Sequence, residues 1–492
     1  MQRFAPATSS RCIDVVNIPR VLVAGLCGGS GKTLVSLGLA AAWRNEGKEV
    51  APFKKGPDYI DAAWLSRAAG RPCRNLDLFL MPRGAVTHSF AVGVRDSDVA
   101  VIEGNRGLYD GMDSQGSYST AELAKLLRTP VVLVVDCTKS TGTTAAVVLG
   151  CQKLDPQVPL GGVVLNRIAG SRHESVVRDA VEQTTGLPVL GTIGRLQEDL
   201  FPERHLGLVP PQEHDQLDRA IDVVRQVAEQ NLDLDRIAEL AHLVRPSDPQ
   251  QRLVSVPGGN RPARARVGVF RDAAFQFYYP ENLEALIQEG ADLIEISPMV
   301  DSAVPQVDAL YIGGGFPETL APALSCNRTF LRSLRDLAEA GLPIYAECGG
   351  AVFLGEKLIY EHESYEMSRV FPTVYAFQKR PRGHGYVELE TVSRNCYYEV
   401  GTAIRGHEFH YTYMQSTGAA EPHFAFKVRR GFGFDGERDG LTYRNVLACY
   451  THVHALGTPG WAPALVRAAE AHASGRKANS GPALAVGAVA GE

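Results

Sequence analysis

"VLVAGLCGGSGKT", residues Val21–Thr33, is the segment that decides the fold of the first half of this 492-residue chain. Its apolar start predicts a buried strand, its glycines predict a tight turn, and the following "LVSLGLAAAWRNEG" predicts a helix. A strand that enters a helix through a glycine-rich turn directs backbone N–H groups and the positive helix end at one point. The segment therefore predicts a phosphate-binding loop in an α/β domain.

The residues of this loop match the chemistry of a bound nucleotide. Lys32 would reach the β- and γ-phosphates, and the Thr33 hydroxyl would bind Mg²⁺. Five residues separate Gly25 from Gly31, one more than in the common phosphate-binding loop. A glycine-rich turn that binds nothing is the alternative, but strand, glycines, Lys-Thr pair and helix all agree on binding. The expected nucleotide contacts are Gly28, Gly29, Ser30, Gly31, Lys32 and Thr33.

Further short apolar runs extend this unit into a sheet. They lie at residues 99–102, 131–135 and 162–165, and they alternate with longer helical patterns. Strands that are apolar on both faces are typical of a parallel sheet covered by helices, so we predict an α/β fold. Such sheets bind ligands at the carboxyl ends of their strands. Asn166, which ends the run "GVVLN", is equally consistent with contact to a nucleotide base and with a turn.

Two acidic segments fall at predicted strand ends. Glu103 in "VIEGNRGLYDG" ends an apolar strand, where a carboxylate can hold Mg²⁺ directly or through water. "FKKGPDYID" supplies Lys55, Asp58 and Tyr59, and the Glu103 segment also supplies Asp110. The alternatives are a surface position for Glu103, a turn or helix-cap role for Asp58 and Asp110, and a solvated Lys55.

"LPIYAECGGAVFLGE" decides the second half: an apolar strand leads to Cys348, then to Gly349 and Gly350, then to a helical pattern. Such a strand-to-helix turn exposes its central side chain, and the N–H groups after it can stabilise an oxyanion. The helix N-terminus is expected to lower the thiol pKa and favour the thiolate. A buried structural cysteine is the alternative, but this context favours a nucleophile.

A nucleophilic cysteine needs a base, and "ACYTHVHA" supplies His452 and His454 about 100 residues later. Residues two apart on a strand share a face, so both rings are expected to point the same way. The strand end "YIGGGFPE" supplies Gly314 and Gly315 for a second oxyanion donor and a glutamine-binding floor. A core or surface histidine is the alternative for His452. "RGHEFHY", residues 405–411, is equally consistent with substrate contact and with structural hydrogen bonding.

Composition sets the broad class of the protein. A hydrophobic share of 45% and a charged share of 21% are typical of a soluble globular protein, and a formal charge of −5 does not suggest nucleic acid or an anionic membrane as partner. No run of 18 apolar residues predicts a membrane span. Nine cysteines without a C-x-x-C pair argue against a zinc site and a disulfide framework, so a reduced, cytoplasmic setting is expected.

The chain is long enough for two domains of roughly 200 to 250 residues. A stretch rich in Pro, Arg and Gly separates two α/β series, the second of which turns into an antiparallel β portion around residues 384–450. The Ala- and Gly-rich end is expected to be disordered. The predicted parts are a leader at 1–19, a first domain at 20–243, a linker at 244–265, a second domain at 266–473 and a tail at 474–492.

These motifs, in this order, resemble the cobyrinate a,c-diamide synthase family over roughly residues 20–470. The resemblance implies a dethiobiotin-synthetase-like ATP domain, in which the longer phosphate-binding loop is known, and then a class I glutamine amidotransferase domain of flavodoxin-like fold. The matching segments are "GGSGKT", "GPDYID", "EGNRGLYDG", "ERHLGLVP", "FQFYYPENLEAL", "GGGFPE", "AECGG", "RGHEFHY" and "YTHVHA".

The resemblance also implies an activity and roles for the residues. Cys348 would attack glutamine with His452 as base, and MgATP would phosphorylate a substrate carboxylate that ammonia then converts into an amide. The substrates would be the a and c acetate groups of a tetrapyrrole polycarboxylate, and a homodimer is consistent with the family. The implied Mg²⁺ and substrate contacts are Thr33, Asp58 and Glu103 for the metal, and Lys55, Asp58, Tyr59, Asp110, Gly314, Gly315 and Gly349 for the substrates.

The sequence departs from the family in three ways. His454 stands where full class I triads carry Glu, so the residue that orients His452 is left open. Asn105 and Arg106 replace residues that are often small or apolar in cobyrinate enzymes, and Arg106 could pair with one more carboxylate. "RGHGYVELE" and "HALGTPGWA" look closer to the branch that amidates siroheme, so we lean slightly to siroheme over cobyrinate; nickel sirohydrochlorin is a third substrate.

Two other classes of protein compete with this interpretation. A non-ligase P-loop ATPase of the partitioning type would carry a signature Lys at the position of Cys27. A stand-alone glutaminase would leave the phosphate-binding loop and both acidic segments without a purpose.

Overall fold

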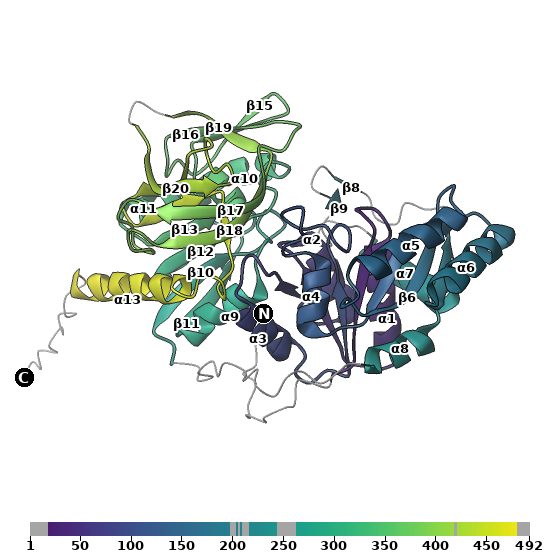
Figure 1. Ribbon diagram of the computed structural model, residues 1–492. Helices are drawn as coiled ribbons and strands as arrows, with labels where there is room; N and C mark the ends of the chain where they lie inside the picture. The colour runs from purple at the N-terminus through teal and green to yellow at the C-terminus, as the bar shows by residue number, and fades with distance from the viewer. Residues whose placement is uncertain are drawn as a thin grey trace, which may run out of the picture. The chain divides into compact units, whose positions relative to one another are not determined.

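The computed structural model describes residues 18–196, 203–204, 207–208, 216–243, 262–417 and 421–479. Contacts along the chain divide it into two compact units, residues 1–78 with 82–254 and residues 79–81 with 255–492. Each unit is built around its own large sheet, with helices beside the strands (Figure 1).

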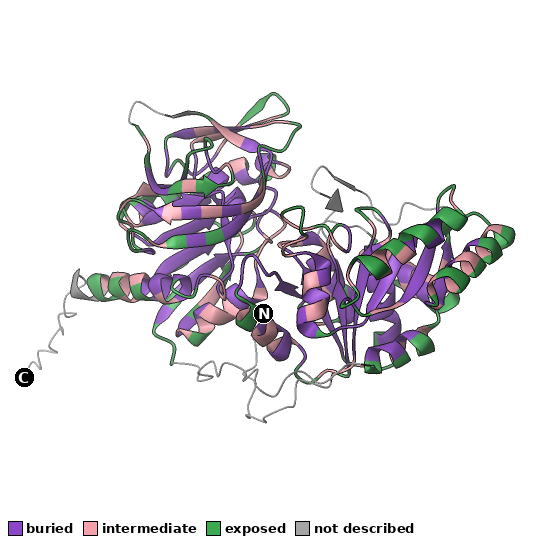
Figure 2. Cartoon of the chain, in the orientation of Figure 1, coloured by how far each residue is buried: buried purple, intermediate pink, exposed green. Residues whose placement is uncertain are grey.

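Seven strands make up the sheet of the first unit in its described residues: β1 (Arg20–Gly25), β2 (Val50–Lys55), β3 (Arg74–Leu76), β4 (Val99–Glu103), β5 (Val131–Asp136), β6 (Leu160–Ile168) and β7 (Val189–Gly194). All are parallel, in the order β3-β2-β4-β1-β5-β6-β7. The predicted strands and the parallel sheet are confirmed. The strands are buried and the helices expose their outer faces (Figure 2), as expected for a sheet covered by helices.

The helices described in the first unit are α1 (Lys32–Asn45), α2 (Ile60–Ala69), α3 (Arg83–Gly93), α4 (Thr120–Leu127), α5 (Gly142–Leu154), α6 (Ser171–Thr185), α7 (Leu217–Asn231) and α8 (Leu234–His242). Local chemistry sets several of their ends: the Ser119 side chain caps α4, and Gly186 ends α6 in the left-handed region. α1 and α7 pack closely, because a β-carbon on Gly38 would lie 2.7 Å from Ala228 Cβ. A short hairpin joins β8 (Glu203–Arg204) to β9 (Gly207–Leu208).

Ten strands form the main sheet of the second unit in its described residues: β10 (Ala265–Phe270), β11 (Ala291–Ile296), β12 (Ala309–Ile312), β13 (Ile344–Glu347), β17 (Gly383–Thr391), β18 (Ala403–His410), β20 (His423–Arg430), β21 (Arg438–Tyr443), β22 (Val446–Cys449) and β23 (His452–Val453). Their order is β11-β10-β12-β13-β22-β21-β20-β17-β18-β23. The part from β11 to β22 is parallel, and the part from β22 to β23 is antiparallel. The antiparallel portion predicted around residues 384–450 is therefore confirmed.

A smaller sheet and five helices complete the described part of the second unit. The small sheet has the order β15-β14-β16-β19. Its strands are β14 (Lys357–Tyr360), β15 (Glu363–Glu366), β16 (Thr373–Phe377) and β19 (Thr412–Thr417). The helices are α9 (Pro280–Gln288), α10 (Ala321–Cys326), α11 (Arg328–Glu339), α12 (Gly349–Phe353) and α13 (Trp461–Asn479).

The main sheet of the second unit has an apolar core on each face. Ile344 and Ala346 of β13 pack into one core, whose members include Phe353. Tyr345, between them in sequence, packs into the other, with its ring centroid 5.6 Å from that of Trp461. Because successive side chains of a strand alternate between faces, each central strand contributes to both cores. This two-sided burial holds the carboxyl end of β13 rigidly in place.

The predicted domain boundaries can be compared with the helix ends and with the residues that the structure describes. α13 continues to Asn479, so residues 474–479, which we assigned to the tail, are helical; Arg476 Nη1 holds this end by donating to the Val307 carbonyl at 3.0 Å. Residues 480–492, most of the predicted leader and residues 244–261 of the predicted linker lie outside the described residues. α8 ends at His242, next to the predicted end of the first domain.

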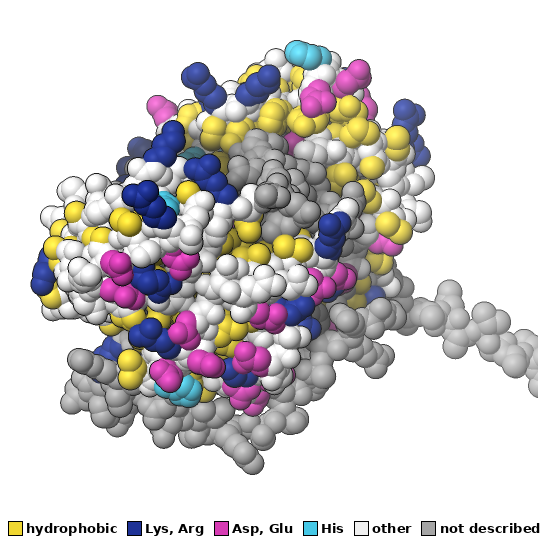
Figure 3. Space-filling view, turned by 90° about the vertical axis from the view of Figure 1, so that its right-hand side faces the viewer, with side chains coloured by type: hydrophobic (Ala, Val, Ile, Leu, Met, Phe, Trp, Pro, Cys, Tyr) yellow, Lys and Arg dark blue, Asp and Glu magenta, His cyan; other side chains and the backbone are white. Residues whose placement is uncertain are grey.

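The surface charges and the polarity of the helices agree with the composition of the chain. On the face shown in Figure 3, Lys and Arg side chains are interspersed with Asp and Glu side chains among the coloured residues. Of the helices that the structure describes, not one combines the length and apolar character needed to cross a bilayer.

Candidate active sites

The phosphate-binding loop connects the carboxyl end of β1 to α1. Gly29 and Gly31 have φ values of 73° and 98°, in the left-handed region that favours glycine. Gly31 also has no room for a side chain, because a β-carbon there would lie 2.2 Å from Asn166 Nδ2. Ser30 Oγ donates to the Cys27 carbonyl at 2.9 Å and accepts from the Cys27 N–H at 3.2 Å. These contacts fix the curved backbone of the loop.

Lys32 and Thr33, the first residues of α1, have different partners. Lys32 Nζ donates to the Cys27 carbonyl at 2.9 Å, so the side chain lies along the loop. Burial lowers the pKa of Lys32, and the charge of Lys54 lowers it further. Thr33 Oγ1 donates to Glu103 Oε1 at 2.8 Å. The hydroxyl and the carboxylate predicted to hold Mg²⁺ therefore lie side by side.

Lys54 is the charged centre of this site, although we did not predict a role for it. Its ammonium lies 2.6 Å from Asp61 Oδ2, 2.8 Å from Glu103 Oε1 and 3.8 Å from Asp58 Oδ2. Burial by itself would lower the pKa of Lys54, but these carboxylates raise it well above its ordinary value. Lys54 therefore stays charged and neutralises part of the acidic cluster formed by Asp58, Asp61 and Glu103.

Lys55, which we predicted as a substrate contact, faces away from this cluster. Its ammonium lies 3.9 Å from Asp77 Oδ2, and burial lowers its pKa. Lys54 and Lys55 are consecutive residues of β2, so their side chains point to opposite faces of the sheet. The sequence shows both lysines in one segment, and only the register of β2 against β4 selects Lys54 as the partner of Glu103.

Glu103 has an oxygen that suits a metal ion. The residue is fully buried, and its Oε2 has no hydrogen-bond partner in the part of the chain that the structure describes. Burial raises the pKa of Glu103, whereas Lys54 opposes the rise. A buried carboxylate oxygen without a partner, next to the Thr33 hydroxyl, is the kind of donor set that Mg²⁺ accepts. Thr33 and Glu103 therefore fit the predicted metal site.

Asp58, a member of this cluster, was also predicted for the first unit. Asp58 Oδ1 accepts from the Asp61 N–H at 2.9 Å in the first turn of α2, and Tyr59 directly precedes that helix. Burial and the charge of Asp61 raise the pKa of Asp58 to about 7. Asp110 is exposed and accepts from the Gly107 N–H at 2.8 Å, the contact expected of its alternative turn role.

Asn166 supports the loop in the structure. Its Nδ2 donates to the Ser30 carbonyl at 2.9 Å, and its Oδ1 accepts from the Arg167 N–H at 2.9 Å. Both ends of the amide are thus engaged by the protein, which favours the structural alternative over a contact with the nucleotide base.

In the second unit, Cys348 occupies a sharp turn between β13 and α12. Its φ of 48° and ψ of −104° are a strained conformation for a residue with a side chain, of the kind found at functional sites. The glycines beside it are required by space: a β-carbon on Gly349 would lie 2.9 Å from Pro317 Cδ and 3.1 Å from Gly315 N. The Cys348 N–H donates to the Cys449 carbonyl at 2.7 Å. The predicted nucleophile turn is present, with Gly315 of the preceding strand end beside it.

The surroundings of Cys348 affect the pKa of its thiol. Burial, together with the Glu318 carboxylate, raises the pKa of Cys348 well above its ordinary value. Our prediction that the helix lowers this pKa is therefore wrong. α12 has only five residues, so its dipole is small, and the loss of hydration by a fully enclosed thiol outweighs it.

His452 lies at the same edge of the sheet as Cys348. Its Nδ1 is 3.2 Å from Oε2 of Glu347, the residue directly before the cysteine. The ring lies close over the glycine-rich strand end, because a β-carbon on Gly314 would be 2.5 Å from His452 Cε1. Gly314 thus lies against His452, and Gly315 lies against Gly349 next to Cys348.

His454 takes no part in this arrangement. Its Nε2 is 3.7 Å from Glu281 Oε2, its Nδ1 accepts from the Leu456 N–H at 3.2 Å, and its ring packs on Tyr279. β23 ends at Val453, so the strand alternation on which we based a shared face does not extend to His454, and a common direction of the two rings stays a prediction.

The "RGHEFHY" segment is chiefly structural. Glu408 accepts from the N–H groups of Phe432 and Gly433 at 2.5 and 2.8 Å, and His410 Nδ1 lies 2.8 Å from the Thr412 carbonyl oxygen. His407 stacks on His452 with centroids 4.9 Å apart, and burial lowers its pKa well below the ordinary value. The segment therefore lines the site through the ring of His407.

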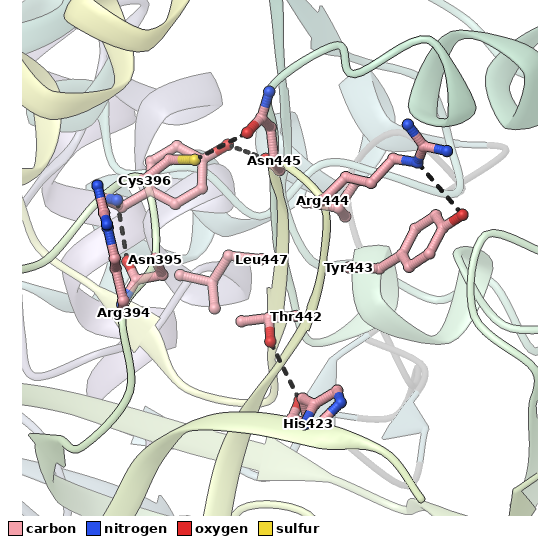
Figure 4. A pocket seen from close by; sticks show the side chains of 11 residues that line it. Arg394, Asn395, Cys396, His423, Thr442, Tyr443, Arg444, Asn445 and Leu447 are labelled. Atoms are coloured by element: carbon pink, nitrogen blue, oxygen red, sulfur yellow. Dashed lines mark hydrogen bonds between the residues drawn. The ribbon is translucent and has the colours of Figure 1, made fainter. Parts of the chain in front are cut away.

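A pocket of about 220 Å³ lies elsewhere in this unit (Figure 4), lined by residues that include Arg394, Cys396 and Asn445. Cys396 Sγ is 3.2 Å from Asn445 Oδ1. Asn445 precedes β22, whereas the Cys348 N–H donates to the carbonyl of Cys449 at the other end of that strand. The pocket is therefore separate from the Cys348 site.

Known proteins with similar sequences define the class of this chain. Residues 21–209 match the model of the CobQ/CobB/MinD/ParA nucleotide binding domain, and residues 266–459 match that of the CobB/CobQ-like glutamine amidotransferase domain. The chain is a carbon–nitrogen ligase of the glutamine-dependent amidotransferase class, built from these two domains.

The chain belongs to the cobyrinate a,c-diamide synthase family. It is 43% identical to the cobyrinate a,c-diamide synthase of Magnetococcus marinus, over 92% of this chain and 97% of the relative. It is 40% identical to the cobyrinate a,c-diamide synthase of Archaeoglobus fulgidus, over 92% of this chain and 98% of the relative. The family resemblance seen in the motifs is thereby confirmed.

Proposed function

We propose that this protein amidates the a and c acetate groups of cobyrinate, using ATP and taking both nitrogens from glutamine. The observation that carries the proposal is that one chain holds two complementary sites. One is a phosphate-binding loop beside Lys54 and the acidic cluster to which Glu103 belongs. The other is a strained turn at Cys348, with His452 at the same edge of the sheet.

The glutaminase step uses the second site. Cys348 Sγ attacks the carboxamide carbon of glutamine while His452 takes the thiol proton, and backbone N–H groups near Gly315 and Gly349 stabilise the oxyanion. Because burial raises the pKa of Cys348, proton removal and attack need to occur together rather than through a preformed thiolate. His452 then protonates the leaving ammonia, and water hydrolyses the thioester to glutamate.

The ligase step uses the first site. A carboxylate oxygen of the substrate attacks the γ-phosphorus of ATP, and ADP leaves with the β–γ bridging oxygen. Lys32 and the loop N–H groups from Gly28 to Gly31 would hold the phosphates. Mg²⁺, held by Thr33 and Glu103, would supply neutralising charge. Ammonia then attacks the acyl phosphate carbon and expels phosphate, which is a far better leaving group than a carboxylate oxygen.

The choice of macrocycle rests on the relatives. Those reported above are named for cobyrinate, whereas the lean toward siroheme rests on two short segments. Tyr59, Asp58 and Asp110 stay our candidates for substrate contact, and a homodimer and a cytoplasmic setting stay predictions.

Mass spectrometry of products tests this proposal. The protein would receive MgATP and glutamine with cobyrinate, siroheme or nickel sirohydrochlorin in parallel. We expect two replacements of hydroxyl by amino on cobyrinate. Double amidation of siroheme or of nickel sirohydrochlorin alone would reassign the substrate within the family. ATP hydrolysis without amidation of any of the three would favour the non-ligase ATPase and refute the proposal.

A further inference from the structure

Glu347 is a fully buried carboxylate at the carboxyl end of β13, directly before the cysteine nucleophile. Three hydrogen-bonding groups of the protein surround it. The Val453 N–H donates to Oε1 at 3.2 Å, the Tyr311 hydroxyl donates to Oε2 at 3.3 Å, and His452 Nδ1 lies 3.2 Å from Oε2. An ionised carboxylate can only accept hydrogen bonds. An ionised Glu347 would therefore favour the neutral His452 tautomer that carries its proton on Nδ1.

We infer that Glu347 is the positioning residue for His452, so that Cys348, His452 and Glu347 form a triad whose acid directly precedes its nucleophile. With Nδ1 protonated toward Glu347, the lone pair of the neutral ring is on Nε2, the nitrogen left to take the thiol proton. Once protonated, the imidazolium is stabilised by the adjacent carboxylate. This inference rests on the proposed glutaminase step.

The position that carries Glu in full class I triads cannot serve here. That position is occupied by His454. Its Nδ1 accepts from the Leu456 N–H, and its Nε2 faces Glu281. Among the contacts of His452 Nδ1 in the described residues, Glu347 is the acid within hydrogen-bond distance.

The carboxylate of Glu347 is itself held in place by a second layer of contacts. Asn282 Nδ2 donates to the Tyr311 hydroxyl at 3.1 Å and to the Val453 carbonyl at 2.9 Å. Asn282 Oδ1 accepts from the Ala455 N–H at 2.7 Å. One buried amide thus ties the tyrosine that orients Glu347 to the strand that carries His452, which fixes the ring relative to the acid.

Replacement of Glu347 by Gln would reverse the tautomer without changing the shape of the side chain. The Val453 N–H can face the amide oxygen but not the amide NH₂, so the NH₂ group is directed toward His452 Nδ1. The ring then carries its proton on Nε2 and cannot accept the thiol proton. We expect kcat for glutamine hydrolysis to fall about 100-fold, the lower end of what a general base contributes, while KM for glutamine is unchanged.

The experiment compares full-length Glu347→Gln, Glu347→Asp and Glu281→Gln with the wild type, on glutamine-driven and on ammonia-driven amidation. Glu281→Gln is the matched control, because Glu281 is also buried and also faces a histidine of the same segment. We expect Glu347→Gln to lose glutamine-driven turnover and keep ammonia-driven turnover, Glu347→Asp to recover part of the loss, and Glu281→Gln to keep both activities.

Wild-type kcat in Glu347→Gln, or an equal loss in Glu281→Gln, would overturn the inference. If Glu347→Gln does not fold, ¹⁵N NMR of histidine-labelled wild type decides, with the His452 signal assigned by its loss in His452→Asn. Protonation at Nδ1 supports the inference, and protonation at Nε2 overturns it. A wild type without glutaminase activity would instead refute the proposed function, so the two failures are distinguishable.

Discussion

Replacement of Lys54 by Met tests the charge balance of the first site. Lys54 is 2% exposed and has carboxylate oxygens at 2.6 and 2.8 Å, and methionine keeps most of its packing. Removing one partner of a buried ion pair costs about 3–5 kcal/mol, because the remaining charges are left uncompensated. In a unit of this size, about 1 kcal/mol lowers Tm by about 2–4 °C, so the first unit should unfold about 6–20 °C lower.

Lys55→Met is the matched control for this measurement. Lys55 is 5% exposed on the same strand, and its ammonium lies 3.9 Å from Asp77 Oδ2, outside the acidic cluster. We expect its Tm loss in scanning calorimetry to be less than half that of Lys54→Met. Mg²⁺ should raise the Tm of Lys54→Met more than that of the wild type, because the freed carboxylates attract the ion. Equal losses in the two variants, or no loss in Lys54→Met, would refute this account of the cluster.

Three further predictions follow from the geometry. Cys348→Ala should lose glutamine-driven amidation and keep ammonia-driven amidation at high pH, whereas Lys32→Ala should lose both. Product assays with each nitrogen source check this prediction, and ammonia-driven activity in Lys32→Ala would contradict it. Gly314→Ala should lower kcat of the glutaminase reaction about 100-fold and leave ammonia-driven amidation intact, because the new β-carbon would displace the His452 ring. A glutaminase rate near that of the wild type would show that the ring has room to move. Burial raises the pKa of Asp439 to about 6, so the folded chain binds this proton more tightly than the unfolded chain. The stability of the wild type relative to Asp439→Asn should fall by about 2 kcal/mol as pH rises from about 4 to about 6.5, and denaturant titrations at several pH values that show a flat or rising difference would disprove it.

The nucleophile turn and the phosphate-binding loop could be predicted because both are local. Each depends on a strand, a few glycines and a helix in one continuous segment, and the backbone conformation that these residues allow is written in their order. The Gly29 and Gly31 torsions and the Cys348 turn confirm this directly. The thiol pKa could not be predicted in the same way, because it depends on how completely the rest of the unit encloses the side chain.

The sequence by itself determined the two α/β units and the phosphate-binding loop, and it supplied the candidates for the nucleophile and its base. Only the tertiary structure decided which neighbours complete these sites. Strand register selected Lys54 over Lys55 for the acidic cluster, and the position of β13 brought Glu347 to His452. The physical reason is that local sequence sets backbone conformation, whereas hydrogen bonds and charge pairs between strands far apart in the chain depend on the register and burial that the whole sheet imposes.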